Sequence, residues 1–441
     1  MEIPDRILIV GLGTSGTAVA RFLTRLGKRI GIADEKTEDK LTDAIASLQG
    51  IPYTGHFGPH RESDFTAYPM IVLSPGVDTE LPVIQAARSA GVRVIGEMEL
   101  ASSFVSEPII AITGTNGKTT TTSLIGEIFN RALRPVFVGG NIGNPLINYL
   151  SGGTKASAVI VEVSSFQLET IESFKPSTAL LLNITEDHLD RYRSYDEYKA
   201  AKYRIFDNQT SSDFSIIRHG LEVATKGSPR ILTFSATNEV REGAFAKGAT
   251  LYVRFDGKES SFRRDISPLV GVHNTENILA AILTARIHGI DDNIIEDALR
   301  RFRGLPHRVE FIRAVRDVSF YNDSKATNVD ATKRALEGFD KNVILIAGGK
   351  DKGGSYKAIR DESARIKALI LIGEARDRIA AELFDVIPTF GESDLTSAVY
   401  AAFSRASAGD VVLLSPMCSS FDMFTSYKDR GNTFRRIVES L

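Results

Sequence analysis

Short runs of leucine and β-branched residues alternate along the chain with glycine-containing polar segments and with stretches of helical periodicity. This alternation is typical of folds in which helices connect the strands of a parallel sheet. The pattern occurs three times, in consecutive blocks of the chain. The sequence therefore predicts an α/β protein of three domains, each built on a mainly parallel sheet.

The first block, residues 1–98, contains apolar runs that are separated by segments long enough to form helices. Short apolar runs of this kind are expected to form strands. The block therefore predicts a small Rossmann-like domain. Its expected strands are Arg6–Val10, Arg29–Ala33, Met70–Leu73 and Val92–Ile95.

The second block, residues 99–303, is the longest, and the third, residues 304–441, follows a linker around Arg303-Gly-Leu-Pro306. The second block predicts a central domain with a mainly parallel sheet, and the third predicts another Rossmann-like domain. The expected elements of the central block are strands Pro108–Ile112, Ala158–Val161 and Thr178–Asn183 and helix Asn274–Ile287. The expected strands of the third block are Asn342–Ile346, Lys367–Ile372 and Asp410–Leu414.

The length of the chain supports a division into domains, and its net charge narrows the class of partner. A chain of 441 residues is too long for one ordinary hydrophobic core. Lys and Arg number 53 against 55 Asp and Glu, so the formal net charge of -2 argues for no nucleic-acid or anionic-membrane partner. There is no signal-like N-terminus and no apolar run of the roughly 20 residues that a membrane helix needs. We expect a cytoplasmic monomer with no membrane insertion.

The single cysteine, Cys418, excludes an intramolecular disulfide and any CxxC metal or redox site. This fits a reducing compartment. Cys418 itself is better interpreted as a small buried hydrophobic residue than as a nucleophile.

A first glycine motif follows the first expected strand. Gly11-Leu-Gly-Thr-Ser-Gly16 has GxGxxG spacing, in which the missing side chains let the backbone turn tightly and approach a phosphate at a helix N-terminus. Asp34 ends the next expected strand, near the place of a ribose-binding acid. The motif alone suits a dinucleotide, a UDP-linked sugar, which also carries a diphosphate and a ribose, or a purely structural turn.

The second glycine motif is more specific. Thr113-Gly-Thr-Asn-Gly-Lys-Thr-Thr120 follows a buried strand and leads into an amphipathic helix, which is typical of a phosphate-binding loop. Its backbone N–H groups form an anion nest, Lys118 can reach the β- and γ-phosphates, and the Thr119 hydroxyl can ligate Mg²⁺. The spacing is shorter than GxxxxGK[ST], because Ile112 stands where that pattern has its first glycine. We predict an ATP- or GTP-dependent domain.

Two further polar residues follow strands of the same block, where ligands gather in parallel sheets. Glu162 ends one strand, and His188 lies in the polar cluster Asn183–Arg191. A neutral imidazole can bind a metal, but Mg²⁺ prefers oxygen, so His188 needs carboxylate-like oxygens beside it. The alternative for His188 is a helix-capping role.

Together these motifs resemble the Mur ligases, in the same order and over essentially the whole chain. The likeness rests on the phosphate loop, Glu162, His188, Lys202, Gly304-Leu-Pro-His-Arg308 and Asn322-Asp-Ser-Lys-Ala-Thr327. Within the family the closest likeness is to the members that add D-glutamate to UDP-N-acetylmuramoyl-L-alanine. That likeness rests on Gly139-Gly-Asn-Ile-Gly143, Val161-Glu-Val-Ser-Ser-Phe-Gln-Leu168 and Leu414-Ser-Pro-Met-Cys-Ser-Ser-Phe-Asp422.

The resemblance implies three domains, which bind the UDP substrate, ATP and the incoming amino acid in that order along the chain. Glu35-Lys36 follows Asp34 where some members of the family carry Thr-Arg, which puts the uracil contacts in doubt. The residues implied for the UDP substrate are Gly13, Thr14, Ser15, Asp34, Ser74, Pro75, Gly76 and Asn141.

The family reaction activates a carboxylate by γ-phosphoryl transfer from ATP, and an amine then attacks the acyl phosphate. Phosphate is a good leaving group, whereas a bare carboxylate would have to expel oxide, so the order makes chemical sense. The residues implied for ATP are Gly114, Thr115, Asn116, Gly117, Lys118, Thr119, Thr120, Asn274, Asn277, Arg308 and Asp323. Those implied for Mg²⁺ are Thr119, Glu162, His188 and Lys202, and those implied for catalysis are Lys118, Glu162, His188, Lys202 and Lys325.

Lys202 can ligate a metal only after it loses its proton and gains an oxygen donor. The family's solution is a carbamate formed with CO₂, and we carry it over as a hypothesis beside the alternative of an ordinary solvated lysine. The pocket implied for D-glutamate offers cations and hydroxyls to a dicarboxylate. Its residues are His188, Thr327, Lys352, Ser420 and Tyr427, and Lys350 is an alternative to Lys352.

Other classes of protein remain as alternatives to this interpretation. A nicotinamide dehydrogenase would use the GxGxxG turn but leaves the phosphate loop and the third block unexplained. A regulator would hydrolyse ATP without forming a bond. Within the ligases, a sister Mur ligase or folylpolyglutamate synthase is the alternative, and the first Rossmann-like block with its Ser74-Pro-Gly76 turn argues against the latter.

Overall fold

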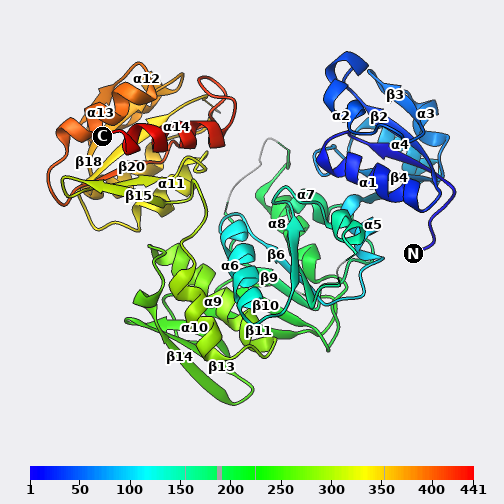
Figure 1. Ribbon diagram of the computed structural model, residues 1–441, viewed down its shortest axis with the longest axis horizontal. Helices are drawn as coiled ribbons and strands as arrows, with labels where there is room; N and C mark the ends of the chain where they lie inside the picture. The colour runs from blue at the N-terminus through cyan, green and yellow to red at the C-terminus, as the bar shows by residue number, and fades with distance from the viewer. Residues whose placement is uncertain (154, 186–190, 224, 352) are drawn as a thin grey trace. The chain divides into compact units, whose positions relative to one another are not determined.

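The computed structural model describes residues 1–153, 155–185, 191–223, 225–351 and 353–441. Its strands form three sheets, which Figure 1 follows from the blue N-terminus to the red C-terminus. The predicted class, α/β with mainly parallel sheets, is confirmed. The chain divides into two compact units, residues 1–263 with 277–298 and residues 264–276 with 299–441. The domain boundaries predicted at 98/99 and 303/304 stay predictions.

The first sheet has the strand order β3-β2-β1-β4-β5, and all its strands are parallel. The predicted strands are present, whereas β3 was not predicted because its residues are half-buried or exposed and carry little apolar signal. The strands are β1 (Arg6–Val10), β2 (Arg29–Asp34), β3 (Tyr53–Phe57), β4 (Met70–Leu73) and β5 (Arg93–Gly96). The helices are α1 (Thr14–Arg25), α2 (Thr42–Ala46), α3 (Glu62–Thr66), α4 (Pro82–Ser89) and α5 (Glu97–Ser102).

The second sheet has nine strands in the order β14-β13-β12-β11-β10-β9-β6-β8-β7. It is parallel from β7 to β12, and β13 and β14 add an antiparallel extension that the sequence analysis did not predict. The strands are β6 (Ile109–Thr113), β7 (Val136–Gly140), β8 (Ala158–Glu162), β9 (Thr178–Leu181), β10 (Phe214–Arg218), β11 (Arg230–Ser235), β12 (Gly243–Lys247), β13 (Thr250–Phe255) and β14 (Lys258–Arg263). The main helices are α6 (Lys118–Arg131), α7 (Ser165–Leu168), α8 (Tyr195–Tyr203), α9 (Val272–Ile287) and α10 (Asp292–Arg301).

The third sheet has the order β15-β16-β20-β17-β18-β19, with only β15 antiparallel to its neighbour. Helix α13 begins with a capping box in which Asp394 accepts the N–H of Ser397. The strands are β15 (Glu310–Val315), β16 (Val318–Asn322), β17 (Val343–Gly348), β18 (Ile366–Ile372), β19 (Thr389–Gly391) and β20 (Val411–Leu414). The helices are α11 (Val329–Leu336), α12 (Arg376–Leu383), α13 (Leu395–Arg405) and α14 (Tyr427–Glu439).

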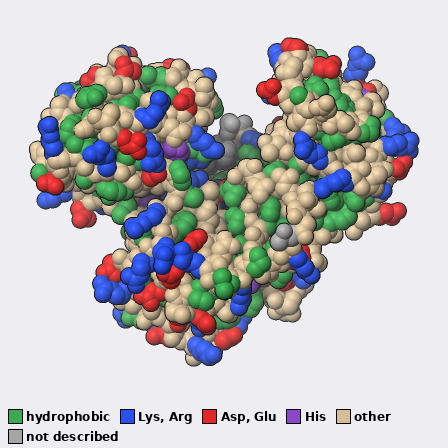
Figure 2. Space-filling model, in the orientation of Figure 1, with side chains coloured by type: hydrophobic (Ala, Val, Ile, Leu, Met, Phe, Trp, Pro, Cys, Tyr) green, Lys and Arg blue, Asp and Glu red, His purple; other side chains and the backbone are tan. Residues whose placement is uncertain are grey.

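The charge of the surface and the hydropathy of the helices are both as the sequence predicts. Basic and acidic side chains are interspersed over the visible face in Figure 2, in keeping with a formal net charge of -2. In the part of the chain that the structure describes, no helix is both long and apolar enough to cross a membrane.

A continuous hydrophobic cluster joins the first two sheets. It contains Ile9 and Val72 from the first sheet and Val161 and Leu181 from the second, all almost fully buried. Burial of apolar area stabilises a fold by about 25 cal/mol per Å². The first sheet is therefore fixed to the second by packing as well as by the covalent chain.

Two buried carboxylates of α5 add directional contacts across the same boundary. Glu99 accepts the backbone N–H groups of residues 172–174 at 2.8–3.0 Å, so both of its oxygens are satisfied. Glu97 accepts the N–H of Ile147 at 2.7 Å, but its Oε2 has no hydrogen-bond partner among the described residues. Burial raises the pKa of Glu97 to about 7, and the Ile147 hydrogen bond only partly opposes this.

We predict that Glu97 makes stability depend on pH. Its pKa is raised from 4.5 to about 7, so between these values the folded protein keeps a proton that the unfolded chain releases. The free energy of unfolding therefore falls as pH rises through this window, by at most about 3 kcal/mol. Glu97→Gln removes this contribution, so the free energy of unfolding should fall less between pH 5 and pH 8 than in the wild type, which urea unfolding measures.

The control for this experiment is Glu2→Gln, which removes a carboxylate at an exposed position. It is expected to leave the pH dependence of unfolding as in the wild type. Parallel pH curves for the wild type and Glu97→Gln would contradict the prediction.

Candidate active site

The phosphate-loop candidate connects β6 to α6, and β6 lies between β8 and β9 in the sheet. Gly114 has φ of 151° and Gly117 has φ of 85°, conformations that favour glycine. A Cβ on Gly117 would also lie 2.2 Å from Oδ1 of Asn277. The glycines are therefore required by the backbone, which directs the N-terminus of a 14-residue helix toward the end of the sheet.

Asn183 holds this loop from the neighbouring strand. Its Oδ1 accepts the N–H of Asn116 at 2.8 Å, and its Nδ2 donates to the Asn116 carbonyl at 3.0 Å. Its own carbonyl accepts the N–H of Thr115 at 3.0 Å. Sequence reasoning used Asn183 as a strand end and as the start of a polar cluster but gave it no role, although a polar residue just past a parallel strand beside the loop was an available signal.

Two lysines converge on the carbonyl of Gly114. Lys118 Nζ donates to it at 2.8 Å and also to the Thr115 carbonyl at 2.8 Å. Lys202 Nζ donates to it at 3.0 Å, is only 2% exposed and lies 4.6 Å from the ring centroid of Tyr198. Two cations beside an uncapped helix N-terminus favour a polyanion such as a nucleotide phosphate.

Glu162 ends β8 and is buried, with 3% of its surface exposed. Its Oε1 accepts from Nδ2 of Asn141 at 3.1 Å, while its Oε2 has no hydrogen-bond partner among the described residues. A half-satisfied buried carboxylate is costly unless a cation joins it, and hard cations prefer oxygen. The described residues contain no cluster of three or more His, Cys, Asp or Glu suited to a metal.

The GxGxxG turn of the first sheet is held by hydrogen bonds to side chains outside the motif. Ser74 Oγ donates to the Gly11 carbonyl at 2.7 Å, and a Cβ on Gly16 would lie 2.0 Å from that carbonyl. Asp34 accepts the N–H of Leu12 at 2.8 Å through Oδ2. Helix α1 starts after Gly13 without a side-chain cap, so the N–H groups of its first turn face no capping side chain.

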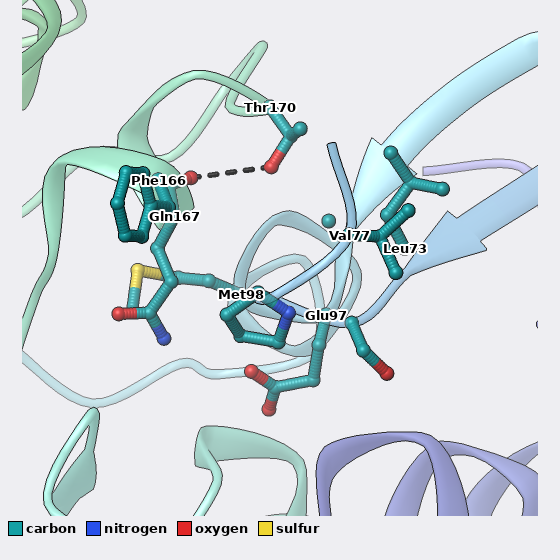
Figure 3. Close-up of a pocket in the computed structure, with 10 residues that line it drawn as sticks. Leu73, Val77, Glu97, Met98, Phe166, Gln167 and Thr170 are labelled. Carbon is teal, nitrogen blue, oxygen red and sulfur yellow. Dashed lines mark hydrogen bonds between the residues drawn. The ribbon is translucent and has the colours of Figure 1, made fainter. Parts of the chain in front are cut away.

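A small cavity lies between the loop after β4 and α7, and Figure 3 shows side chains of both segments around it. Its volume is about 10 Å³, which is room for about one water molecule and not for a substrate. The residues that line it include Ser74, Pro75, Phe166, Gln167 and Thr170.

In the second unit, Asp323 is buried at the end of β16. Its Oδ2 accepts from Ser415 Oγ at 2.8 Å and its Oδ1 accepts the N–H of Val309 at 3.2 Å. Burial raises the pKa of Asp323 to about 7, although both hydrogen bonds and the guanidinium of Arg308 oppose the rise. The neighbouring Lys325 lies 4.2 Å from the ring centroid of Tyr427.

Arg430 is a buried residue that sequence reasoning missed. It is 1% exposed and donates to the carbonyls of Ser324 at 2.9 Å, Cys418 at 3.1 Å and Ser419 at 3.3 Å. Burial lowers its pKa to about 10. The sequence gave no signal for it, because α14 contains several arginines and nothing in the sequence tells which of them is buried.

The remaining predicted residues fall in different parts of the fold. Asn277 lies in the first unit and is buried against the phosphate loop, whereas Asn274 lies in the second, where its Nδ2 donates to the Val270 carbonyl at 2.7 Å. Ser420 is buried, and Thr327, Arg308 and Tyr427 are half-buried. His188 and Lys352 lie outside the described residues.

Cys418 is 1% exposed, as expected of a small buried hydrophobic residue. Its Sγ lies 3.3 Å from the hydroxyl of Tyr356, and burial raises the pKa of its thiol. A neutral, enclosed thiol is a poor nucleophile.

Fold and site together define an α/β nucleotide-binding protein with a phosphate loop on its central sheet and a Rossmann-like sheet on either side of it in the chain. Three family profiles match the chain, and each corresponds to one of the three sheets. They are the Mur ligase MurD-like N-terminal domain over residues 5–96, the Mur ligase middle domain over 112–285 and the Mur ligase glutamate ligase domain over 307–418. The chain belongs to the Mur ligase family.

Two full-length relatives are named UDP-N-acetylmuramoylalanine--D-glutamate ligase. The one from Geotalea daltonii is 46% identical and the match covers 100% of this chain and 99% of the relative. The one from Geobacter metallireducens is also 46% identical with the same coverage. Among solved structures, MurF from Acinetobacter baumannii has a TM-score of 0.62 at 17% identity, covering 100% of this chain and 95% of that one, and so shares the fold.

We predict that Glu162→Gln separates stability from cation binding. Removing a buried charge that lacks a partner on Oε2 should keep the free energy of unfolding within about 1 kcal/mol of the wild type or raise it. Mg²⁺ with ATP should raise the melting temperature of the wild type and not of the variant, which thermal unfolding measures.

Asn141→Ala is the matched control, because it removes the hydrogen bond to Glu162 and keeps the charge. It should destabilise the protein by about 1–3 kcal/mol. A large loss of stability in Glu162→Gln, or the same stabilisation by Mg²⁺ and ATP as in the wild type, would contradict the prediction.

Proposed function

We propose that the protein is an ATP-dependent ligase that joins D-glutamate to UDP-N-acetylmuramoyl-L-alanine in peptidoglycan synthesis. Relatives that are 43–46% identical over nearly the whole chain carry the name of this activity. The observation that carries the chemistry is the phosphate loop with two lysines on the Gly114 carbonyl, in the sheet where β8 ends in the half-satisfied carboxylate of Glu162.

The reaction proceeds in two transfers. The carboxylate of the L-alanine moiety attacks the γ-phosphorus of ATP, which forms an acyl phosphate and releases ADP. The uncharged amine of D-glutamate then attacks the acyl carbon, the C–O bond to phosphate breaks, and the amine loses a proton as the amide forms. Catalysis is mostly positioning and charge stabilisation, for which the phosphate-loop N–H groups and Lys118 are suited.

Thr119 and Glu162 are the proposed ligands of one Mg²⁺, and His188 and Lys202 serve a second site. When bound, Mg²⁺ neutralises charge on the phosphoryl oxygens. A carbamate on Lys202 supplies the oxygen that an ammonium lacks, and its N–H still donates to the Gly114 carbonyl as Lys202 does here. Crystallographic evidence of an unmodified Lys202 in active, Mg²⁺-loaded protein would overturn this part of the proposal.

The substrate sites follow the family pattern. The α1 N-terminus with the Ser74-Pro-Gly76 turn holds the UDP moiety, and Asn141 reaches the same substrate. Asn274, Asn277, Arg308 and Asp323 serve ATP, Lys325 acts in catalysis, and Thr327, Lys352, Ser420 and Tyr427 receive D-glutamate. The protein acts as a monomer in the cytoplasm.

The alternatives are less well supported. A dehydrogenase would use the GxGxxG turn alone and leave the second sheet without a purpose, and a regulator would hydrolyse ATP without an acceptor. A sister Mur ligase that adds another amino acid differs only in the last step, so the amino-acid requirement decides between them.

The test is phosphate release from ATP and Mg²⁺ with UDP-N-acetylmuramoyl-L-alanine and D-glutamate together, with each omitted singly, and with other amino acids in place of D-glutamate. We expect release only with both substrates and a selection for D-glutamate. Release with another amino acid would leave the ligase chemistry in place and overturn the substrate assignment, and release without an acceptor would overturn the ligase.

A further inference from the structure

The Ser74–Val77 turn after β4 is fixed at both of its ends. The N–H of Val77 donates to the Ser74 carbonyl at 3.0 Å, which closes the turn, and Ser74 Oγ binds the GxGxxG loop at Gly11. The carbonyl of Val77 accepts from Nη2 of Arg191 at 3.1 Å. Arg191 belongs to the segment between β9 and α8 of the second sheet, so one end of this turn is held by the sheet that carries the phosphate loop.

Arg191 is itself held on two sides. Nη2 also donates to Oε2 of Glu169 at 3.2 Å, and the guanidinium lies 4.1 Å from the ring centroid of Phe166. The side chains of Arg191 and Glu169 are 19% and 18% exposed, so water screens the ion pair only in part. Phe166 and Val77, the two groups that Arg191 bridges, both line the small cavity in Figure 3.

The contacts continue from Glu169 to the phosphate loop. Its Oε1 accepts from the Tyr192 hydroxyl, and the Tyr192 ring stacks on Phe166 at an interplanar angle of 13° and packs against Tyr198. Burial and the Glu169 carboxylate raise the pKa of Tyr192, so its hydroxyl stays a donor at neutral pH. The Tyr198 hydroxyl lies 3.1 Å from Oγ1 of Thr115, a residue of the phosphate loop.

We propose that Arg191 is a positioning residue that sets the Ser74–Val77 turn relative to the phosphate loop, and so fixes where the UDP-linked substrate presents its carboxylate. The inference rests on the proposed function, in which that turn holds the UDP moiety. Phosphoryl transfer needs the attacking oxygen in line with the γ-phosphate, and a displacement of about 1 Å can cost about 100-fold in rate. The two binding elements belong to different sheets, which makes the connection between them a determinant of that alignment.

Arginine suits this place better than lysine. Its planar guanidinium donates to Val77 and Glu169 while it stacks on Phe166, whereas an ammonium group neither forks nor stacks in this way. Arg191→Lys therefore keeps the charge but loses the paired hydrogen bonds and the stacking on Phe166, and Arg191→Gln loses the charge as well. Tyr192→Phe leaves Arg191 in place and removes only the hydroxyl that joins Glu169 to Tyr192.

Steady-state kinetics of the full-length protein test the proposal. We expect Arg191→Gln and Arg191→Lys to raise KM for UDP-N-acetylmuramoyl-L-alanine about tenfold and to lower the maximal rate, because the turn that holds this substrate loses a charge-assisted hydrogen bond and its carboxylate loses its alignment. KM for ATP and for D-glutamate should change less than about twofold, because the phosphate loop keeps its own contacts to Asn183 and Lys118. Tyr192→Phe should shift KM for the UDP substrate in the same direction by a smaller factor.

Arg93→Gln is the matched control. Arg93 pairs with Glu172 across the same pair of sheets, but their side chains are 37% and 45% exposed and lie outside the chain of contacts from Val77 to Thr115. Its loss should leave all three KM values within about twofold of the wild type. Equal effects of Arg93→Gln and Arg191→Gln would mean that any interdomain ion pair matters and would overturn the proposal.

The outcomes separate this inference from the proposed function. A wild type that does not turn over the UDP substrate refutes the function itself. A wild type that does so, with neither KM for the UDP substrate nor the maximal rate changed in the Arg191 variants, refutes the positioning role alone. Thermal unfolding identifies a variant that fails to fold, in which case Tyr192→Phe and Arg191→Lys decide.

Discussion

The geometry of the turn between β6 and α6 is the constraint on which the central site depends. Gly114 and Gly117 adopt left-handed or otherwise glycine-favouring conformations, and through them the N-terminus of α6 comes to the end of the sheet. The neighbouring strands end in Glu162 and just before Asn183, so the parallel sheet brings a carboxylate and an amide to the same edge as the loop. Asn183, Lys118 and Lys202 contact backbone groups of this turn, so its conformation determines where these side chains lie.

Buried carboxylates of the first unit show how the same group serves structure or chemistry. Glu99 accepts hydrogen bonds from backbone N–H groups through both oxygens and so links the first sheet to the second. Glu162 keeps one oxygen without a described partner, which costs stability in the absence of a cation. Arg430 has the same structural role in the second unit, where it donates to carbonyls of the two segments that follow β16 and β20. Glu97 has one oxygen without a described partner as well, so an unpartnered oxygen alone does not distinguish the two roles, and Glu162 differs from it in lying at the end of a strand beside the phosphate loop.

The strands with strong apolar runs were predictable, because their side chains are buried on both faces of the sheet, as in β1 and β8. The strands β3 and β14 were not, since partly exposed strands need fewer apolar residues. The glycine motifs were predictable for a similar reason, because a missing side chain at a fixed spacing is visible in the sequence. Arg191 and Arg430 carried no such signal, since their partners lie at least 11 residues away along the chain, from Arg430 to Ser419, and up to 114, from Arg191 to Val77.

The sequence by itself determined the class of fold, the phosphate loop and membership in the Mur ligase family, because these depend on local patterns of hydrophobicity and glycine. Only the tertiary structure decided that Lys118 and Lys202 meet at one carbonyl, that one oxygen of Glu162 is left without a described partner, and that Arg191 joins two sheets. The physical reason is that a hydrogen bond forms only when donor and acceptor lie about 2.7–3.2 Å apart. Residues far apart in the chain reach such positions only after the sheets have packed.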